Sequence, residues 1–384
     1  MASVHFLTYE CRREQKLIPG KEHRIVGRIR NGGATRLHAL SRKWALIFLT
    51  VLCIVAAAPC ARAREVVDMD GCKITVPDRV IKVYATSPPS TYMLYAMDPD
   101  VLVGLNFPLK EQERRFLRKS VTTKPVIGGF FGQGQTANPE LILKADPDVI
   151  IMWRQKGSMG KSMMEEEMMK KFPIPKFHVQ VDSLKDYEKA FIFVGRLLGK
   201  EDRAMVLSKY GRDALTDVQK KIGSIPASKR VRVYYAEGPD GLSTECDTSW
   251  HGELINLAGG VNVHRCDIKD QMGMEKVNLE QVIAYNPDLI VVQEDTFFDA
   301  IFKDPRWQTV KAVKDKRVYL IPKAPFNWFD RPPSFMRFLG VKWFANCLYP
   351  NEYPIDIVGT AKKFYKLFLG IDLSDEEIRK VIYP

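Results

Sequence analysis

Residues 138–151 read NPELILKADPDVII and residues 278–291 read NLEQVIAYNPDLIV, so one pattern occurs twice at an offset of 140 residues. In each copy an asparagine precedes a short stretch with apolar residues at helical spacing, which predicts a capped helix. A Pro-Asp pair then takes the chain out of the helix, and the apolar run after it predicts a strand buried on both faces. Each copy therefore predicts an α–turn–β unit.

A second similarity supports a duplicated plan. Residues 79–85 (RVIKVYA) resemble residues 230–236 (RVRVYYA), and both predict the first strand of a domain. We therefore expect an α/β protein with two Rossmann-like lobes, one long connecting helix and a ligand cleft between the lobes. The predicted parts are a leader with an export signal (1–63), an N-terminal α/β lobe (64–199), the connecting helix (200–222), a C-terminal α/β lobe (223–354) and a helical tail (355–384).

The leader has the order of a secretory signal. Basic residues at 42–43 precede fifteen uncharged, mostly apolar residues (Trp44 to Ala58), and Ala61-Arg62-Ala63 follows as an A-x-A cleavage pattern. Such a helix would be roughly 22 Å long, shorter than the ~30 Å hydrocarbon core of a bilayer. The sequence predicts cleavage after Ala63 and a periplasmic location, and a retained anchor is the alternative.

The positive charge is concentrated in the leader. Residues 1–63 carry eleven basic and three acidic side chains, which give +8 of the net charge of +12 and leave +4 for the other 321 residues. A body with so little excess charge has no electrostatic reason to bind nucleic acid. We therefore expect no nucleic-acid partner.

Four cysteines would remain after cleavage: Cys72, Cys246, Cys266 and Cys347. An even count in an exported protein permits disulfides. The closest pair in loop-like sequence, Cys246 and Cys266, is the expected bridge, and four unlinked thiols are the alternative. The cysteine spacing does not match a zinc motif, so we predict no structural metal site.

Several motifs occur in a fixed order behind the export signal: the two repeat units, the single connecting helix, Gly259-Gly260-Val261-Asn262 and Asp315-Lys316-Arg317-Val318-Tyr319. Over residues 66–350 this set resembles the ferric-siderophore and cobalamin class of ABC-transporter solute-binding proteins. The resemblance implies a two-lobed binding protein without catalysis or a cofactor. It also implies a partner permease in the inner membrane.

Two segments are similar to the cobalamin-binding members in particular: Met152-Trp153-Arg154, and Asn327 to Arg331 ahead of Pro332-Pro333-Ser334. The resemblance implies that the aromatic side chains and the Asp/Arg pair of these segments face a corrinoid.

Members of this class also carry an acidic residue at the tip of each lobe, which pairs with arginines of the permease. In this sequence Met159 occupies the N-terminal-lobe position, so the pattern is not met there. The nearest acids, Glu165 and Glu166, are the expected permease-docking residues.

Ligands of open α/β sheets bind beyond the carboxyl ends of the strands, and this rule selects candidates without any resemblance. Aromatic rings would offer flat apolar area to a bulky ligand, and arginines would donate two hydrogen bonds to its oxygens. His251 could ligate an incompletely chelated metal. The alternatives are core packing, surface ion pairs and a hydrogen-bonded histidine. The candidate ligand-binding residues are Ser87, Pro88, Trp153, Arg154, Glu237, His251, Glu294, Trp328, Phe329, Asp330 and Arg331.

The expected function is capture of an iron(III)-siderophore-type metal chelate and its delivery to the permease, by a monomer. A corrinoid, haem, or a nickel or cobalt chelate is the alternative ligand. An exported α/β enzyme is the alternative from another class. The sequence contains no G-x-S-x-G, H-E-x-x-H, P-loop or G-x-G-x-x-G motif, which disfavours that reading.

Overall fold

The computed structural model describes residues 63–130, 136–155, 159–266 and 274–383. The chain divides after Arg62, and Ala63–Pro384 forms one compact unit. The export signal predicted within residues 41–63 thus lies outside the described residues, except for Ala63. Within the described ranges, no helix combines the length and the apolar character needed to cross a bilayer.

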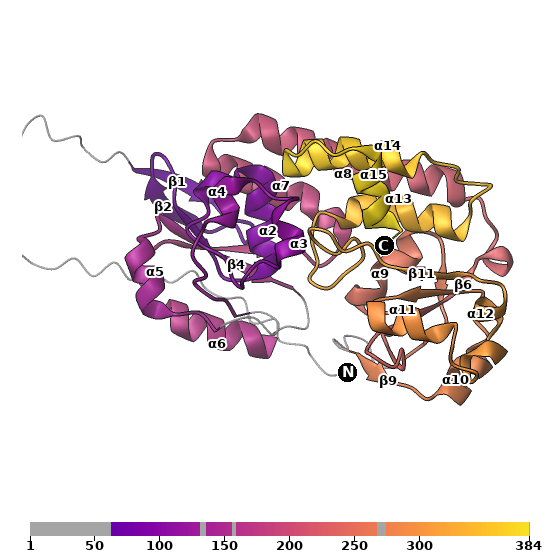
Figure 1. Cartoon of the computed structure of the whole chain (residues 1–384). Helices are drawn as coiled ribbons and strands as arrows, with labels where there is room; N and C mark the ends of the chain where they lie inside the picture. The colour runs from indigo at the N-terminus through magenta and orange to yellow at the C-terminus, as the bar shows by residue number, and fades with distance from the viewer. Residues whose placement is uncertain (1–62, 131–135, 156–158, 267–273, 384) are drawn as a thin grey trace, which may run out of the picture. The chain divides into compact units, whose positions relative to one another are not determined.

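Two separate parallel sheets form the framework of this unit, which confirms the α/β prediction (Figure 1). The N-terminal sheet has the order β3-β4-β5 and the C-terminal sheet has the order β11-β10-β6-β8. Two antiparallel pairs, β1–β2 and β7–β9, lie outside them. The strands are β1 (Ala63–Val67), β2 (Lys73–Pro77), β3 (Val83–Ala85), β4 (Val149–Arg154), β5 (Lys176–Gln180), β6 (Arg232–Ala236), β7 (Ser243–Thr244), β8 (Val261–Asn262), β9 (Glu275–Lys276), β10 (Leu289–Val292) and β11 (Val318–Leu320).

Helices connect the strands and form the end of the chain. They are α2 (Pro88–Met97), α3 (Glu111–Arg114), α4 (Lys119–Thr122), α5 (Pro139–Ala145), α6 (Met159–Met169), α7 (Tyr187–Leu198), α8 (Glu201–Ile222), α9 (Glu253–Leu257), α10 (Leu279–Tyr285), α11 (Asp295–Ile301), α12 (Lys311–Lys314), α13 (Arg337–Leu348), α14 (Ile357–Phe364) and α15 (Asp375–Ile382). A π-helical turn, Tyr365–Leu369, directly follows α14.

The two repeat copies fold as the pattern predicts, α5–β4 and α10–β10. Asn138 accepts hydrogen bonds from the first-turn amides of α5, and Asn278 caps α10 in the same way. At the other end of each helix the repeat places Asp146 and Asn286 in the left-handed region, with φ of 49° and 46°. Aspartate and asparagine tolerate this conformation better than most residues, which explains why they stand there.

The aspartate of each Pro-Asp pair joins its unit to the first strand of the sheet. Asp148 Oδ2 accepts hydrogen bonds from the backbone N–H groups of Ile81 and Lys82, both at 2.8 Å. Asp288 Oδ2 accepts one from Arg232 N at 3.0 Å. The same contact therefore fixes the register of β4 beside β3 and of β10 beside β6.

The predicted helix at 200–222 is observed as α8, after Gly199 ends α7 with φ of 64°. α8 packs along α7 and also against α13. Gly211 permits a close approach to α13, because a Cβ at that position would lie 2.5 Å from the Phe338 ring. The boundaries of the predicted lobes and tail remain predictions, since the chain contacts separate only the first 62 residues from the rest.

The largest core cluster takes side chains from one face of each parallel sheet. In β4 it includes Val149, Ile151 and Trp153, whereas Ile150 and Met152 point into a separate cluster on the opposite face. This alternation is the two-residue period of a strand. It directs Trp153 toward α7 and the central core.

Candidate functional site

A buried cluster of charges lies beyond the carboxyl end of β6, around Arg331. The Arg331 guanidinium donates to Glu237 Oε1 at 2.7 Å and to Glu245, and Asp330 Oδ2 lies 3.5 Å away. The three carboxylates are fully buried, whereas Arg331 is 28 % exposed. One cation therefore serves three carboxylates that have lost their contact with water.

A histidine completes this cluster. His251 Nδ1 lies 2.5 Å from Asp330 Oδ2. Burial lowers the pKa of His251, but the charge and hydrogen bond of Asp330 outweigh it and raise the pKa above 6.5. On the same loop, Ser249 donates to Glu245 Oε2 at 2.7 Å and accepts from the His251 amide. The loop between β7 and α9 thus presents both the imidazole and one of the carboxylates.

Burial perturbs the ionisation of Glu237, and the neighbouring carboxylates add to the effect. Burial raises the pKa of Glu237 from 4.5 to about 7, although Arg331 opposes the shift. Within the described part of the chain, Glu237 Oε2 and Asp330 Oδ1 are buried without a hydrogen-bond partner. A buried polar atom without a partner is costly unless a ligand, a proton or water satisfies it.

The segment that carries Arg331 is held by side-chain amides. Asn327 Oδ1 accepts the amides of Phe329 at 2.7 Å and Asp330 at 3.0 Å, which forms a tight turn. Asn327 Nδ2 in turn donates to Gln293 at the end of β10. The ends of β6 and β10 and the segment 327–331 therefore meet at one place.

A second group of polar side chains connects this place with the N-terminal sheet. Arg337, fully buried at the start of α13, donates to Glu253 at 2.8 Å, and its guanidinium lies 4.5 Å from the ring centroid of Trp250. Glu253 also accepts the amide of Leu184, which follows β5. Burial raises the pKa of Tyr187, and the nearby charge of Arg337 opposes this shift. The centroid of the Tyr187 ring lies 6.0 Å from that of Trp153.

Four hydrogen-bond donors in this second group are unsatisfied. Trp153 Nε1, Tyr187 Oη, Trp250 Nε1 and Arg337 Nη1 are buried and have no hydrogen-bond partner among the residues that the structure describes. Trp153 and Tyr187 belong to the N-terminal sheet and α7, whereas Trp250 and Arg337 belong to the C-terminal part. We call these four residues the donor set. Its chemistry is that of a site for a group that accepts hydrogen bonds.

The predicted N-terminal candidates form a different environment. Arg154 pairs with Asp70 at 2.8 Å and Glu166 at 3.4 Å, and His178 approaches the same two acids. All four side chains keep 23–34 % of their surface exposed. Arg154 is thus directed to a half-exposed ion-pair network rather than to the donor set.

The expected docking acids differ in exposure. Glu165 is 5 % exposed, and burial raises its pKa from 4.5 to about 7 despite a hydrogen bond with Thr86. The Glu166 carboxylate forms an ion pair with Arg154 and lies beside His178. A role of Glu165 and Glu166 in permease docking stays a prediction.

The remaining candidates are structural in this conformation. Ser87 bonds to Ser90 in the cap of α2, and Pro88 is its first residue. Trp328 is fully buried, with Nε1 3.4 Å from the Tyr365 hydroxyl. Phe329 packs on Tyr235 and Phe344. Glu294 is the half-buried residue before α11. Direct ligand contact by these residues stays a prediction.

Sequence reasoning missed Glu245, Glu253, Tyr187 and Arg337. Arg337 carried a usable signal, because it interrupts the apolar run Phe335-Met336-Arg337-Phe338-Leu339, and a charge in a buried helix needs a partner. The other three have no such signal, since their roles arise only from tertiary contacts. The structure also joins Cys246 to Cys266 in a disulfide, the pair expected from the sequence.

Comparison with known proteins identifies the family. Residues 131–325 match the periplasmic binding protein family. An ABC transporter solute-binding protein from Sulfurospirillum deleyianum has a similar structure, with a TM-score of 0.78 and 39% identity over 84% of this chain and 99% of that one.

Two curated relatives differ in what their names say they bind. The molybdate-binding protein MolA of Haemophilus influenzae is 35% identical over 152 residues, which are 38% of this chain and 41% of that protein. The chain thus spans about two fifths of the length of this relative. The haem uptake protein IsdE of Staphylococcus aureus is 27% identical over 210 residues, 51% of this chain and 67% of that protein.

Proteins of this family act outside the cytoplasm as solute receptors for transport and are not enzymes, in agreement with the expectation from the sequence. They deliver their ligand to an ABC permease. The chain therefore belongs to the periplasmic binding protein family, as a solute-binding protein of an ABC importer.

Proposed function

We propose that this protein captures a small metal oxyanion of the molybdate type and delivers it to its permease. The donor set is the single observation that carries this proposal. Its buried N–H and O–H groups lack partners among the described residues, and an oxyanion supplies several acceptor oxygens at one point.

The composition of the donor set favours an anion over a large macrocycle. Two indole N–H groups, a phenol and a guanidinium each need an acceptor atom, and the oxygens of one anion could supply several. The aromatic rings that would stack on a macrocycle, Trp328 and Phe329, are fully buried in contacts with other aromatic rings. A chelate that stacked on these two rings would have to displace that packing.

The neighbouring cluster opposes an anion less than its three carboxylates alone would suggest. Glu237 has a pKa raised to about 7, so it is partly protonated near neutral pH. Each proton held there reduces the negative charge that opposes an anion. The similarity to the molybdate-binding MolA supports the same ligand class.

Calorimetric titration of the compact unit Ala63–Pro384 with molybdate and tungstate tests the proposal, with sulfate and phosphate as competing anions. We expect one equivalent to bind and to raise the melting temperature. Trp250→Phe keeps an aromatic ring but removes the N–H donor together with the five-membered part of the indole. It should weaken binding by about 1.5–3 kcal/mol, the value of a hydrogen bond to a charged group.

Trp307→Phe is the matched control, because Trp307 packs on Tyr234 and Phe297 in a separate core cluster. It should leave the affinity unchanged. Absence of heat and of a melting shift with all four anions would rule out the oxyanion.

The second candidate ligand is a metal chelate, which a specific contact favours. A carboxylate bonded to one nitrogen of an imidazole is the usual arrangement behind a metal-ligating histidine, and Asp330 holds His251 Nδ1 in this way. Ferric siderophore, cobalamin, haem and a nickel–histidine complex therefore belong in the same titration. Binding of one of these that His251→Gln abolishes, together with no response to oxyanions, would favour the chelate.

A further inference from the structure

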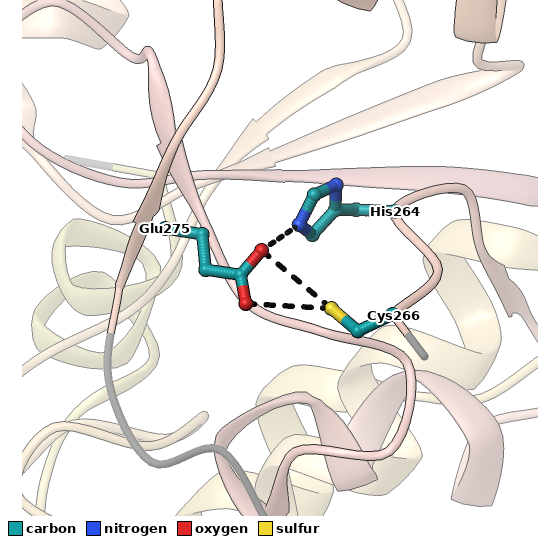
Figure 2. A group of neighbouring side chains, drawn as sticks. All are labelled: His264, Cys266 and Glu275. Atoms are coloured by element: carbon teal, nitrogen blue, oxygen red, sulfur yellow. Dashed lines mark hydrogen bonds and ion pairs between the residues drawn. The ribbon is translucent and has the colours of Figure 1, made fainter. Parts of the chain in front are cut away.

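His264, Cys266 and Glu275, none of which belongs to the donor set, form a compact group in the C-terminal part (Figure 2). His264 Nε2 lies 2.6 Å from Glu275 Oε2, and Cys266 Sγ lies 3.5 Å from Glu275 Oε1. One ligand atom of each residue lies within 4.8 Å of the others. This spacing lets one ion contact all three.

The disulfide places a fourth metal-ligating residue beside this group. Cys246 is bonded to Cys266, with their Cα atoms 5.6 Å apart. In the disulfide neither sulfur is a thiolate, and only a thiolate binds a metal strongly. Reduction would create two thiols next to the imidazole and the carboxylate.

The imidazole is already oriented as a ligand. His264 Nδ1 lies 3.0 Å from the Tyr285 hydroxyl, and the His264 amide donates to Asn262 Oδ1. The side chain is 10 % exposed, so few other orientations are open to it. A metal-bound histidine ordinarily uses one nitrogen for the metal and the other for such an outer hydrogen bond.

We propose that Cys246, Cys266, His264 and Glu275 form a zinc site that is assembled when the disulfide is reduced. A dithiol reductant transfers two electrons and two protons to the disulfide, which yields two cysteine thiols and the disulfide of the reductant. Zn²⁺ then displaces both thiol protons and takes the place of the proton between His264 Nε2 and Glu275 Oε2, which lie 2.6 Å apart. The zinc-bound imidazole would carry its proton on Nδ1, which faces the Tyr285 oxygen.

The ligand types favour zinc over harder cations. Two thiolates, one imidazole and one carboxylate make a four-coordinate set of the kind that Zn²⁺ accepts. Magnesium and calcium prefer six or more oxygen ligands, and this group offers only the oxygens of one carboxylate. The disulfide and the zinc ion would be alternative cross-links between the same two loops. One loop comprises residues 244–249, and the other follows β8.

Cobalt(II) is the probe for the test, because thiolate ligation gives it a charge-transfer band in the near ultraviolet. We expect the reduced unit Ala63–Pro384 to bind one equivalent with this band, and the oxidised protein to show none. Zn²⁺ should displace the cobalt and abolish the band. Reduced protein without the band would overturn the proposal.

Variants assign the ligands. Cys266→Ser and His264→Gln should each remove or strongly weaken the band, and Tyr285→Phe should weaken binding by about tenfold to hundredfold. Cys347→Ser is the thiol control and should leave the band unchanged. A band that persists in both ligand variants would contradict the proposal, and far-ultraviolet circular dichroism of each variant separates loss of the site from loss of the fold. Oxyanion binding is measured separately, so failure of either proposal leaves the other standing.

Discussion

The two repeat copies fold alike, yet the charges at the edges of the two sheets that contain them are arranged differently. At the end of β4, Arg154 pairs with acids whose side chains are 27–34 % exposed. Beyond the C-terminal sheet, on the segment after β11, Arg331 is similarly exposed, at 28 %, but its acids are fully buried. The arginines are nearly equal in exposure, so the burial of their partners makes the difference. A duplicated scaffold can thus carry one solvent-screened network and one desolvated network.

The largest expected effect tests this difference directly. Arg331→Met should lower the free energy of unfolding by about 3–5 kcal/mol, because it leaves buried carboxylates without their cation. Arg154→Met should lower it by only about 0–1 kcal/mol, as for partly exposed pairs. Urea unfolding at neutral pH measures both.

Arg306→Met is the control for the loss of an arginine, since Arg306 is 75 % exposed and, among the residues that the structure describes, pairs with Asp304 alone. It should change stability by about 0.5 kcal/mol or less. Equal losses for Arg331→Met and Arg154→Met would show that partner burial does not distinguish the two networks.

The second effect concerns pH and a buried acid on α6, in the N-terminal part of the protein. The pKa of Glu165 is raised from 4.5 to about 7, so between these values the folded state keeps a proton that the unfolded chain releases. Stability therefore falls as pH rises through this window. Glu165→Gln should remove this decline and raise stability at pH 8 by about 1–3 kcal/mol.

Urea unfolding between pH 4.5 and 8 checks the slope, and Glu167→Gln serves as the control, because the Glu167 side chain is 71 % exposed. A wild-type slope that survives in Glu165→Gln would assign the proton to another group, of which Glu237 is the first to examine.

The smallest effect tests whether the two copies are equivalent where they look alike. Asp146→Ala and Asn286→Ala should each lower stability by about 1–2 kcal/mol, the usual penalty for a left-handed backbone at alanine. The glycine variants at both positions should be close to neutral. Thermal unfolding compares the four proteins, and unequal alanine effects would show that the copies have diverged in their turns as well.

Most of the scaffold could be predicted from the sequence, because it depends on local signals that recur. Asn138 and Asn278 mark helix starts, the Pro-Asp pairs mark turns, and Gly199 marks the end of α7. These residues act on their own backbone neighbours, so their meaning survives without tertiary information.

The candidate site was predictable only in part. The 327–331 segment was found, but the direction of each side chain was not. The sequence around Trp328 looks the same whether its side chain faces a ligand or Tyr365, and only the packing of the folded chain decides between the two. Arg154 is expected at the ligand because it stands at the end of a strand, whereas its observed partner Asp70 lies 84 residues away in sequence and could not be recognised. Burial and long-range pairing are properties of the assembled chain.

The close packing of the Phe338 ring against Gly211 limits how this receptor can signal that it has bound its ligand. The ring lies between the backbone of α8 and Tyr187, next to Arg337 of the donor set. Any large rotation of one half of the molecule against the other would have to separate the Phe338 ring from Gly211. A permease that distinguishes ligand-bound from ligand-free receptors would therefore have to sense a change of surface charge or a shift of a few side chains, rather than a large closure of the two halves.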